Sequence, residues 1–530
     1  MIGVSPKQVK QTAANSLFPA GIQFKVTQVP GRLRKTALTK LDHLIVISPN
    51  RPKPSLWSDI SGLKSLQLRI SRLGKAAAGR ALRCSLGGST TVTTLGLMPP
   101  IKAGATFSAF SLLKFAGDLV ADAIADEPRS IGLIAHGFAA DEAERIVSAL
   151  LLALGARAWQ APVFRKESRP EQLKKVQLLG LQREIDLDRV LAEINGANLV
   201  RGLTALPANK LNSTTYRKLL ATLATQNGWD FEWLDESALA KLGAGAFLAV
   251  SQGNASRDAG IAHLRYRPGG KVSQPDLALV GKGIIFDTGG TNTKGATHML
   301  DMHMDMSGSA VSLAVLQALT ALASPLSVDC WLAITENRSG PNAYKQRDVI
   351  TASNGVTIEI MHTDAEGRMV LADTLALAGK DKPKLIIDYA TLTGTCVHAL
   401  SERYSGIFSN REALNELLVR VGRDSGERVW PFPMDEDFDD DLRSKIADVS
   451  QCSSSGEADQ ILAARFLQRF VPETAIWIHM DLSAVTRKDG LGQMPGGYTG
   501  FGVRYSLALL LDRAADLHEM ATPVVRPRHR

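Results

Sequence analysis

From about residue 200 onward, apolar segments with the length of β-strands alternate with segments that have the apolar spacing of helices. The strand-like segments are residues 277–281 (LALVG), 327–334 (SVDCWLAI), 356–361 (VTIEIM), 384–389 (KLIIDY) and 475–481 (AIWIHMD). Helical spacing covers residues 307–323 and 368–380. Strands separated by helices form mainly parallel sheets that are covered on both faces. The sequence therefore predicts an α/β fold that binds its ligands beyond the carboxyl ends of the strands.

The chain before residue 200 contains a smaller set of similar elements. Residues 41–48 (LDHLIVIS) and 130–136 (SIGLIAH) are strand-like, and residues 141–154 have helical spacing. The polar segment 164–175 (FRKESRPEQLKK) is typical of an exposed connection between domains. We predict a smaller N-terminal α/β domain over residues 1–175, a linker helix region over 176–200, and a larger catalytic domain over 201–530, with a mainly parallel central sheet flanked by helices.

Composition narrows the class of protein. The chain has 530 residues, of which 45% are hydrophobic, so it can bury large cores and form two or three domains. Its four cysteines include no CxxC pair, which argues against a disulfide framework and against a cysteine zinc site. No apolar run of about 18 residues occurs, and the first residues lack a secretory pattern. We therefore expect a cytoplasmic protein without a membrane span.

The net charge of +8 permits an acidic partner such as a nucleic acid. Seven Lys or Arg residues precede the first acidic residue, Asp42, and the chain ends in the basic segment 526–530. No nucleic-acid-binding motif accompanies this charge, so solvated termini are the favoured interpretation. Nucleic acid remains an alternative partner.

Polar and acidic residues concentrate in three segments, 281–290 (GKGIIFDTGG), 302–306 (MHMDM) and 361–368 (MHTDAEGR), which we expect at the ends of strands. Buried carboxylates need cations, so the acids of these segments favour divalent metals if they converge. Two ions about 3.5 to 4 Å apart can activate a water molecule and polarise a carbonyl or phosphoryl oxygen. Asp364 and Glu366 are two positions apart, which on an extended segment places them on the same side.

Residues 362–373 (HTDAEGRMVLAD) resemble the NTDAEGR-type signature of the leucine aminopeptidase family, also called the cytosol aminopeptidase family. Residues 280–290 (VGKGIIFDTGG), 343–349 (AYKQRDV) and 388–394 (DYATLTG) follow the same family in order and spacing. The resemblance covers about residues 200 to 510. It implies a metal-dependent hydrolase that removes N-terminal residues from peptides.

Carried over by position, the resemblance implies two divalent ions, with Mn²⁺ or Zn²⁺ favoured and Mg²⁺ or Co²⁺ possible. The implied ligands of the tighter ion are Lys282, Asp287, Asp305 and Glu366, and those of the exchangeable ion are Asp287, Asp364 and Glu366. Asp287 and Glu366 would bridge the two ions. Lysine binds a metal only when neutral, and two adjacent cations would depress its pKa.

The resemblance also implies roles for residues that bind no metal. Lys294 would stabilise the developing negative charge on the substrate carbonyl oxygen, and Arg368 would hold a bicarbonate ion that moves the proton. The residues implied to line the first substrate pocket are Met302, Thr391, Leu392 and Gly394. His362 replaces the usual Asn near the second substrate residue. Family members assemble as hexamers, which implies a homohexamer acting on peptides.

Two alternatives to a peptidase remain. The first is a DNA-binding role, alone or alongside peptidase activity, and the second is a scaffold that has lost catalysis. The complete set of implied ligands argues against the scaffold. His298 and His303 lie near the implied ligands in the sequence but match none of them, and the acidic run 435–441 lacks the spacing of a calcium loop.

Overall fold

A six-stranded sheet forms the centre of the N-terminal part of the computed structural model, which describes residues 21–86, 89–99, 107–165, 173–270, 272 and 274–521. The sheet order is β1-β6-β5-β2-β4-β3, and all neighbours are parallel except β3 and β4. Its strands are β1 Lys25–Val29, β2 His43–Ser48, β3 Ala81–Ser85, β4 Val92–Leu97, β5 Ser130–Ala135 and β6 Lys175–Leu179. Its helices are α1 Lys35–Leu38, α2 Ser55–Asp59, α3 Lys64–Leu73, α4 Ala109–Ile124 and α5 Ala140–Ala158.

Alternation along β2 shows how this sheet is covered. Ile45 and Ile47 belong to a core shared with α4 and α5, whereas Leu44 and Val46 belong to a core shared with α2 and α3. Successive side chains of a strand point to opposite faces, so one apolar strand contributes to both cores. The N-terminal part is therefore an α/β unit, as predicted, and helices cover both faces of its sheet.

The second part contains an eight-stranded sheet in the order β15-β14-β17-β13-β9-β10-β8-β7. Its strands are β7 Asp230–Asp235, β8 Gly260–Tyr266, β9 Leu277–Asp287, β10 Val328–Asn337, β13 Leu385–Ala390, β14 Ser405–Ser409, β15 Val429–Pro431 and β17 Ile476–Asp481. The central strands β17, β13, β9 and β10 are parallel. Antiparallel pairs occur towards the edges, between β10 and β8, β8 and β7, and β14 and β17.

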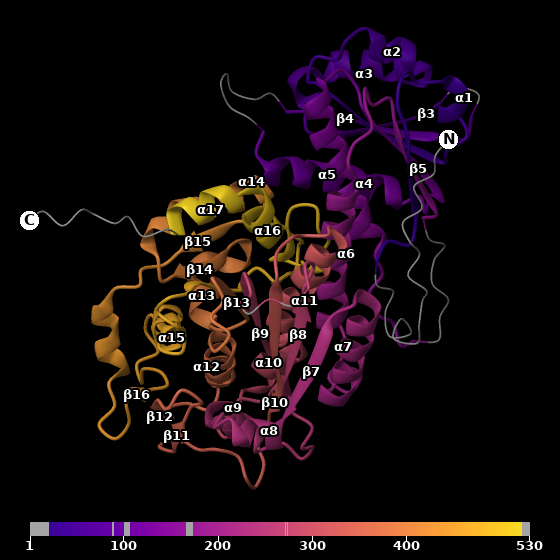
Figure 1. The fold of residues 1–530 in the computed structure, drawn as a ribbon. Helices are drawn as coiled ribbons and strands as arrows, with labels where there is room; N and C mark the ends of the chain where they lie inside the picture. The colour runs from indigo at the N-terminus through magenta and orange to yellow at the C-terminus, as the bar shows by residue number, and fades with distance from the viewer. Residues whose placement is uncertain are drawn as a thin grey trace, which may run out of the picture.

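Helices cover both faces of this larger sheet (Figure 1). One core joins the sheet to α6 Asp188–Thr204, α7 Ser213–Asn227, α11 Ser307–Ala321, α14 Asn415–Ser425 and α16 Val503–Leu507. The opposite core joins it to α8 Glu236–Lys241, α9 Gly245–Ser251, α12 Glu366–Gly379 and α15 Asp459–Gln468. The remaining α-helices of the described part are α10 Ala296–Met299, α13 Gly394–Leu400 and α17 Ala514–Ala521. The predicted fold class is confirmed.

Two elements, β6 and α6, lie where the two units meet. β6 belongs to the first sheet, which therefore extends past residue 175 to Leu179. α6 lies between the two sheets and contacts both units, because Asn198 and Arg201 donate hydrogen bonds to the carbonyl oxygens of Gly155 and Ala156, 3.1 and 2.7 Å long. The division at residues 175 and 200 stays a prediction.

The predicted strand at residues 356–361 lies outside the central sheet. It forms β12 Thr357–Glu359, which pairs with β11 Val349–Thr351 and β16 Val449–Ser450 in a small sheet of three strands. A further pair is formed by β18 Thr486–Arg487 and β19 Gly497–Tyr498. Ile358 is buried against the α12 core, so its apolar pattern reflects burial in a core rather than membership of the central sheet.

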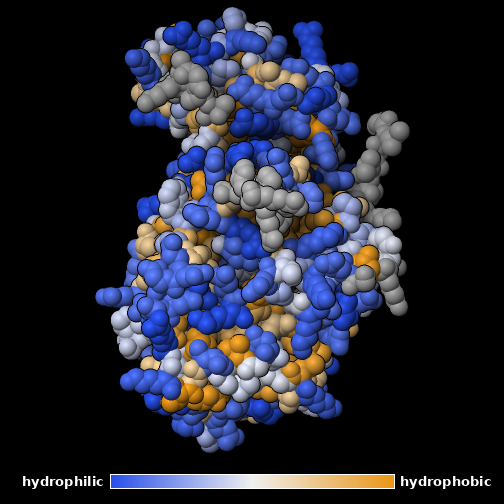
Figure 2. Space-filling model, turned by 60° about the vertical axis from the view of Figure 1, so that its left-hand side comes forward, coloured by the Kyte–Doolittle hydropathy of each residue, from blue (hydrophilic) through white to orange (hydrophobic). Residues whose placement is uncertain are grey.

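The surface shows no continuous apolar belt on the face drawn in Figure 2, where hydrophobic residues form separate patches, mostly on the lower, C-terminal unit. Among the described helices, none combines the length and apolar character needed to cross a membrane.

Candidate metal centre

Strand β9 carries the first two predicted ligands at the centre of the large sheet. Lys282 and Asp287 are 3% and 2% exposed, and β9 is flanked by β10 and β13. A side chain at Gly367 of α12 would crowd Lys282, because its Cβ would lie 2.6 Å from Cε and 2.7 Å from Nζ of that lysine. The absence of a side chain at residue 367 therefore provides the space that the buried ammonium group occupies.

The remaining predicted ligands come from segments that are not strand ends. Asp305 lies between the 3-10 helix Met302–Met304 and α11, Asp364 lies in a turn, and Glu366 is the first residue of α12. The expectation that Asp364 and Glu366 share an extended segment is thus wrong. A turn followed by a helix brings them together instead, because helix α12 starts at Glu366.

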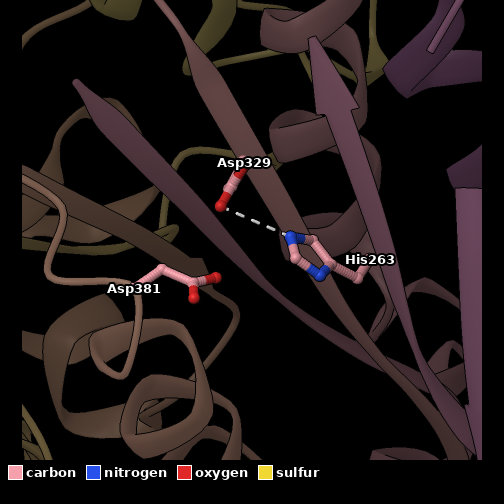
Figure 3. Close-up of side chains that lie close together, drawn as sticks. All are labelled: His263, Asp329 and Asp381. Carbon is pink, nitrogen blue, oxygen red and sulfur yellow. Dashed lines mark ion pairs between the residues drawn. The ribbon is translucent and has the colours of Figure 1, made fainter. Parts of the chain in front are cut away.

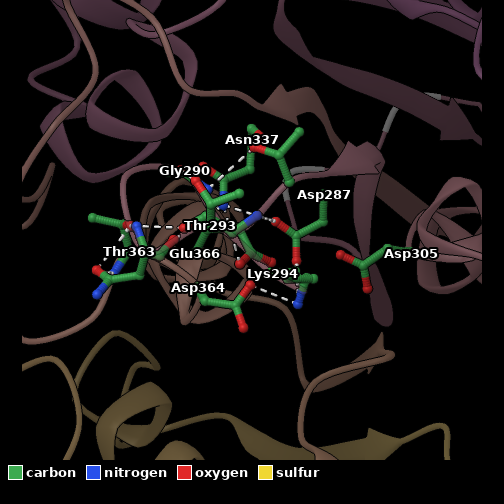
Figure 4. A network of polar contacts seen from close by, with 12 residues as sticks. Asp287, Gly290, Thr293, Lys294, Asp305, Asn337, Thr363, Asp364 and Glu366 are labelled. Atoms are coloured by element: carbon green, nitrogen blue, oxygen red, sulfur yellow. Dashed lines mark hydrogen bonds and ion pairs between the residues drawn. The ribbon is translucent and has the colours of Figure 1, made fainter. Parts of the chain in front are cut away.

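The predicted ligands converge at the carboxyl end of β9 (Figure 4). Asp287, Asp364 and Glu366 each offer an oxygen, and these oxygens lie within 4.8 Å of one another. Lys282 Nζ lies 2.8 Å from both oxygens of Asp305 and 3.0 Å from Glu366 Oε1. Lys294 Nζ lies 2.9 Å from Asp287 Oδ2 and 2.6 Å from Asp364 Oδ1. The structure thus brings together the five predicted metal ligands and Lys294.

The charge balance of this cluster is negative, since four carboxylates form ion pairs with two ammonium groups. Burial raises the pKa of Glu366 to about 8 and that of Asp305 to about 6. Burial opposes the charged form of Lys282, but the carboxylates of Asp305, Glu366 and Asp287 outweigh it and raise its pKa. Divalent cations fit this donor set because they neutralise the excess charge and favour ionised carboxylates and a neutral lysine.

Asn337, at the end of β10, was not among the predicted site residues. Its Nδ2 donates to Asp287 Oδ1 at 2.8 Å and to the carbonyl oxygen of Thr363 at 3.0 Å, and it lies 3.4 Å from Glu366 Oε2. Asn337 therefore fixes one oxygen of Asp287 and the segment before Glu366. Its position just beyond the predicted strand 327–334 was the available signal, because ligands gather at the carboxyl ends of neighbouring strands.

Residues 198–507 match the catalytic domain of the cytosol aminopeptidase family. The chain belongs to this family. A probable cytosol aminopeptidase of Chlorobaculum tepidum is 38% identical over 351 residues, which are 65% of this chain and 69% of that protein. The family resemblance and the enzyme class predicted from the sequence are confirmed: the chain is a metal-dependent aminopeptidase, a hydrolase that cleaves peptides from their N-terminal end.

Two solved structures resemble the aminopeptidase over most of its length. The bottromycin maturation enzyme BotP in complex with Mn has a TM-score of 0.74 and 28% identity, and the match covers 89% of this chain and 99% of that chain. A mutant of tomato leucine aminopeptidase has a TM-score of 0.80 and 26% identity, and the match covers 92% of this chain and 97% of that chain. The overall arrangement of two α/β units is therefore shared with leucine aminopeptidases.

Two of the predicted pocket residues, Thr391 and Leu392, lie near Lys282. The carbonyl oxygen of Thr391 accepts a hydrogen bond of 2.9 Å from Lys282 Nζ, and Thr391 Oγ1 donates to Asp305 Oδ1 at 2.7 Å. Leu392 borders Gly367, and its N–H donates to Asp481 Oδ1 at 3.1 Å. This part of the predicted pocket is therefore anchored both to the carboxylate cluster and to the end of β17.

The other predicted contact residues are placed less tightly. Gly394 is exposed at the start of α13, and Met302 is half-buried in the 3-10 helix that contacts β9. His362 is exposed, and its Nδ1 accepts from the backbone N–H of Asp364 at 3.3 Å. His303 bonds the Tyr498 hydroxyl at 2.7 Å, which accounts for one of the two histidines that were not assigned as ligands.

A second group with metal-ligand chemistry lies at the opposite end of the sheet (Figure 3). It consists of His263 on β8, Asp329 near the start of β10, and the exposed Asp381 before β13. Asp329 already forms an ion pair with Arg267 and lies 3.4 Å from His263 Nε2. The Arg267 charge compensates the buried carboxylate, so we interpret this group as structural.

Proposed function

We propose that the aminopeptidase removes apolar N-terminal residues, leucine in particular, from peptides, and that two divalent ions serve the hydrolysis. The convergence of four carboxylates and two lysines at one end of β9 supports this proposal. Lys282, Asp305, Asp287 and Glu366 would hold one ion, and Asp287, Asp364 and Glu366 the other. The proposed ions are Mn²⁺ or Zn²⁺, and the BotP structure contains Mn.

When bound, such ions supply an activated water molecule and polarise the scissile carbonyl. Lys294 would then donate to the carbonyl oxygen, where negative charge develops, because divalent charge replaces its role as the counter-ion of Asp287 and Asp364. Thr391 and Leu392, with Met302 and Gly394, would accommodate the apolar side chain of the N-terminal residue. His362, beside Asp364, would contact the leaving part of the peptide.

The hydrolysis also needs a group that carries the proton. The resemblance implies a bicarbonate ion at Arg368, but Nη2 of Arg368 already donates to both oxygens of Asp459, at 2.7 and 2.8 Å. The Nε of Arg368 is buried and has no hydrogen-bond partner among the described residues. A bicarbonate ion would therefore have to bind Arg368 at Nε.

We further propose a cytoplasmic homohexamer. Exposed apolar residues of the C-terminal unit, Leu300, Trp430 and Ile446, are available for contacts between copies. The DNA-binding alternative still depends on net charge alone, and the basic segment 526–530 lies outside the described residues. Duplex binding that weakens steeply with salt would support that alternative.

Hydrolysis of leucine amide tests the proposed function directly. The enzyme is treated with a chelator and reloaded with Mn²⁺ or Zn²⁺, and leucine release is compared with that from N-acetyl-leucine amide. We expect metal-restored cleavage of the free amine only. Asp364→Asn should abolish it, whereas the control Asp381→Asn, which removes an acid at the opposite end of the sheet, should not. Inactivity with every metal and with a wider panel of free-amine peptides would refute the proposal.

A further inference from the structure

Arg368 is a buried cation close to the proposed metal ligands. It lies in the first turn of α12, two residues after Glu366, and it is 1% exposed. A guanidinium group withdrawn from water requires an anion and hydrogen-bond acceptors. The question for Arg368 is therefore which anion neutralises its buried charge.

The chain itself supplies a carboxylate at this position. Asp459 accepts two hydrogen bonds from Arg368 Nη2, 2.7 and 2.8 Å long, and its side chain is 26% exposed. Asp459 is the first residue of α15, where the helix dipole favours a negative charge. The preceding residue, Ala458, has φ of 51° and ψ of 26°, a left-handed conformation that is costly for alanine. The backbone thus accepts local strain immediately before the residue that reaches Arg368.

The same guanidinium is connected to the segment that carries two proposed ligands. Arg368 Nη1 donates to the carbonyl oxygen of Gln451 at 3.1 Å. The Gln451 side chain in turn accepts from the backbone N–H of His362 at 3.1 Å and donates to the carbonyl oxygen of Ala365 at 2.9 Å. These residues flank Asp364 and precede Glu366. The position of Arg368 therefore affects the geometry of the metal ligands.

We propose that Asp459 is the permanent counter-anion of Arg368, a positioning residue that takes the place of an exogenous bicarbonate ion. A second anion at Arg368 would share one guanidinium with Asp459, and the two negative charges would repel each other. For its kinetic consequence the inference rests on the proposed aminopeptidase function. The consequence is a reaction that proceeds at the same rate in carbonate-free buffer and in buffer containing bicarbonate.

Anion rescue of an Asp459 variant provides the test. The metal-loaded full-length enzyme and its Asp459→Ala, Asp459→Asn and Asp459→Glu variants are assayed on leucine amide in carbonate-free buffer, with and without bicarbonate or formate. We expect no anion response from the unmodified enzyme. Asp459→Ala should lose about 10- to 100-fold in kcat, the range found when a group that orients metal ligands is removed. Formate or bicarbonate should restore part of this loss, and Asp459→Glu should retain most of the activity.

A second ion pair of α15 offers a matched control. Arg465 donates to Asp439 with bonds of 2.8 and 2.7 Å, and the Asp439 side chain is 31% exposed. Asp439→Ala removes a carboxylate of similar exposure from an arginine at a similar distance, away from the proposed ligands; Asp439 also pairs with Arg469 at 3.2 Å. Its activity should show no response to formate or bicarbonate. This comparison separates anion replacement at Arg368 from a general effect of salt on a weakened helix.

Thermal denaturation tests the role of Asp459 without an activity assay. The melting temperature of Asp459→Ala should rise with added formate or bicarbonate, because the anion binds the folded protein at the position that the Asp459 carboxylate has left. The unmodified protein should show no such rise. If the unmodified enzyme cleaves no peptide, the proposed function fails, yet this measurement still decides the role of Asp459. Strong activation of the unmodified enzyme by bicarbonate would overturn the inference, as would an Asp459→Ala variant indifferent to anions in both assays.

Discussion

Substitution of Gly367 by alanine should damage the metal centre while changing stability little. The added Cβ would lie 2.6 Å from Cε and 2.7 Å from Nζ of Lys282, so the lysine must move. Its Nζ is held by Asp305 and by the carbonyl oxygen of Thr391 at 2.8 and 2.9 Å. Disturbing a group that orients a metal ligand costs about 10- to 100-fold in metal affinity or activity, and we expect a loss in that range.

The free energy of unfolding should respond differently to Gly367→Ala. Overpacking costs about 1 to 3 kcal/mol, but replacing glycine by alanine inside a helix recovers about 1 kcal/mol. The melting temperature should therefore fall only slightly. Gly379→Ala is the matched control, because it lies in the same helix and its Cβ would meet Pro472 Cγ at 2.5 Å, away from the site.

Three measurements compare these variants: metal affinity by competition with a chelating dye, kcat/KM on leucine amide, and thermal denaturation. Gly367→Ala should lose affinity and activity, whereas Gly379→Ala should lose stability alone. If Gly367→Ala bound metal as tightly as the unmodified enzyme and cleaved at the same rate, the assignment of Lys282 as a metal ligand would be refuted.

Three further predictions concern the titration of Glu366, the support that Asn337 gives to the site, and the titration of Glu427, a buried residue that accepts hydrogen bonds from the backbone N–H groups of Gly502 and Tyr505. Burial raises the pKa of Glu366 to about 8, so metal binding must displace a proton from this carboxyl group. Metal affinity measured with the dye should therefore weaken as pH falls from about 8 to 6, and a pH-independent affinity would contradict this prediction. Asn337→Ala removes the 2.8 Å hydrogen bond to Asp287 and should reduce metal affinity or activity about 10- to 100-fold. Metal content after dialysis and kcat measure this effect, and full metal content with unchanged kcat would contradict the prediction. Burial raises the pKa of Glu427 to about 7, above the value of about 4.3 for an unfolded chain, so the folded state binds the extra proton and the free energy of unfolding should decrease as pH rises from about 5 to 7. In thermal denaturation, Glu427→Gln should lose less stability over this pH range than the unmodified protein. An identical pH dependence in both proteins would contradict the raised pKa of Glu427.

Local patterns predicted several elements of the fold closely. Residues 307–323 and 384–389 form α11 and β13 almost as predicted, because helix and strand periodicities reflect faces that must be buried. Residues 356–361 were assigned correctly as a strand but to the wrong sheet. A buried apolar strand has the same pattern in a large and in a small sheet, so its sequence does not identify its partners.

For the candidate site, too, the sequence predicted the residues better than their local geometry. The acidic motifs and their family resemblance were sufficient to select Asp287, Asp364 and Glu366, because the chemistry of metal binding restricts which side chains can serve. The structure brings these oxygens within 4.8 Å of one another, although their individual roles stay predictions. The short spacing also suggested an extended segment for Asp364 and Glu366. That prediction was wrong, because Asp364 lies in a turn and Glu366 is the first residue of α12.

The sequence by itself determined the family, the α/β class and the residues with metal-binding chemistry, because each depends on residue type and on spacing along the chain. Only the tertiary structure decided the order of the strands, the bonds of Asn337 to Asp287, and the pairing of Arg368 with Asp459. Asn337 is 50 residues from Asp287, and Asp459 is 91 residues from Arg368. Such partners meet because packing of helices on the sheet sets their positions, and no local pattern records which distant side chain will supply the missing hydrogen bond or charge.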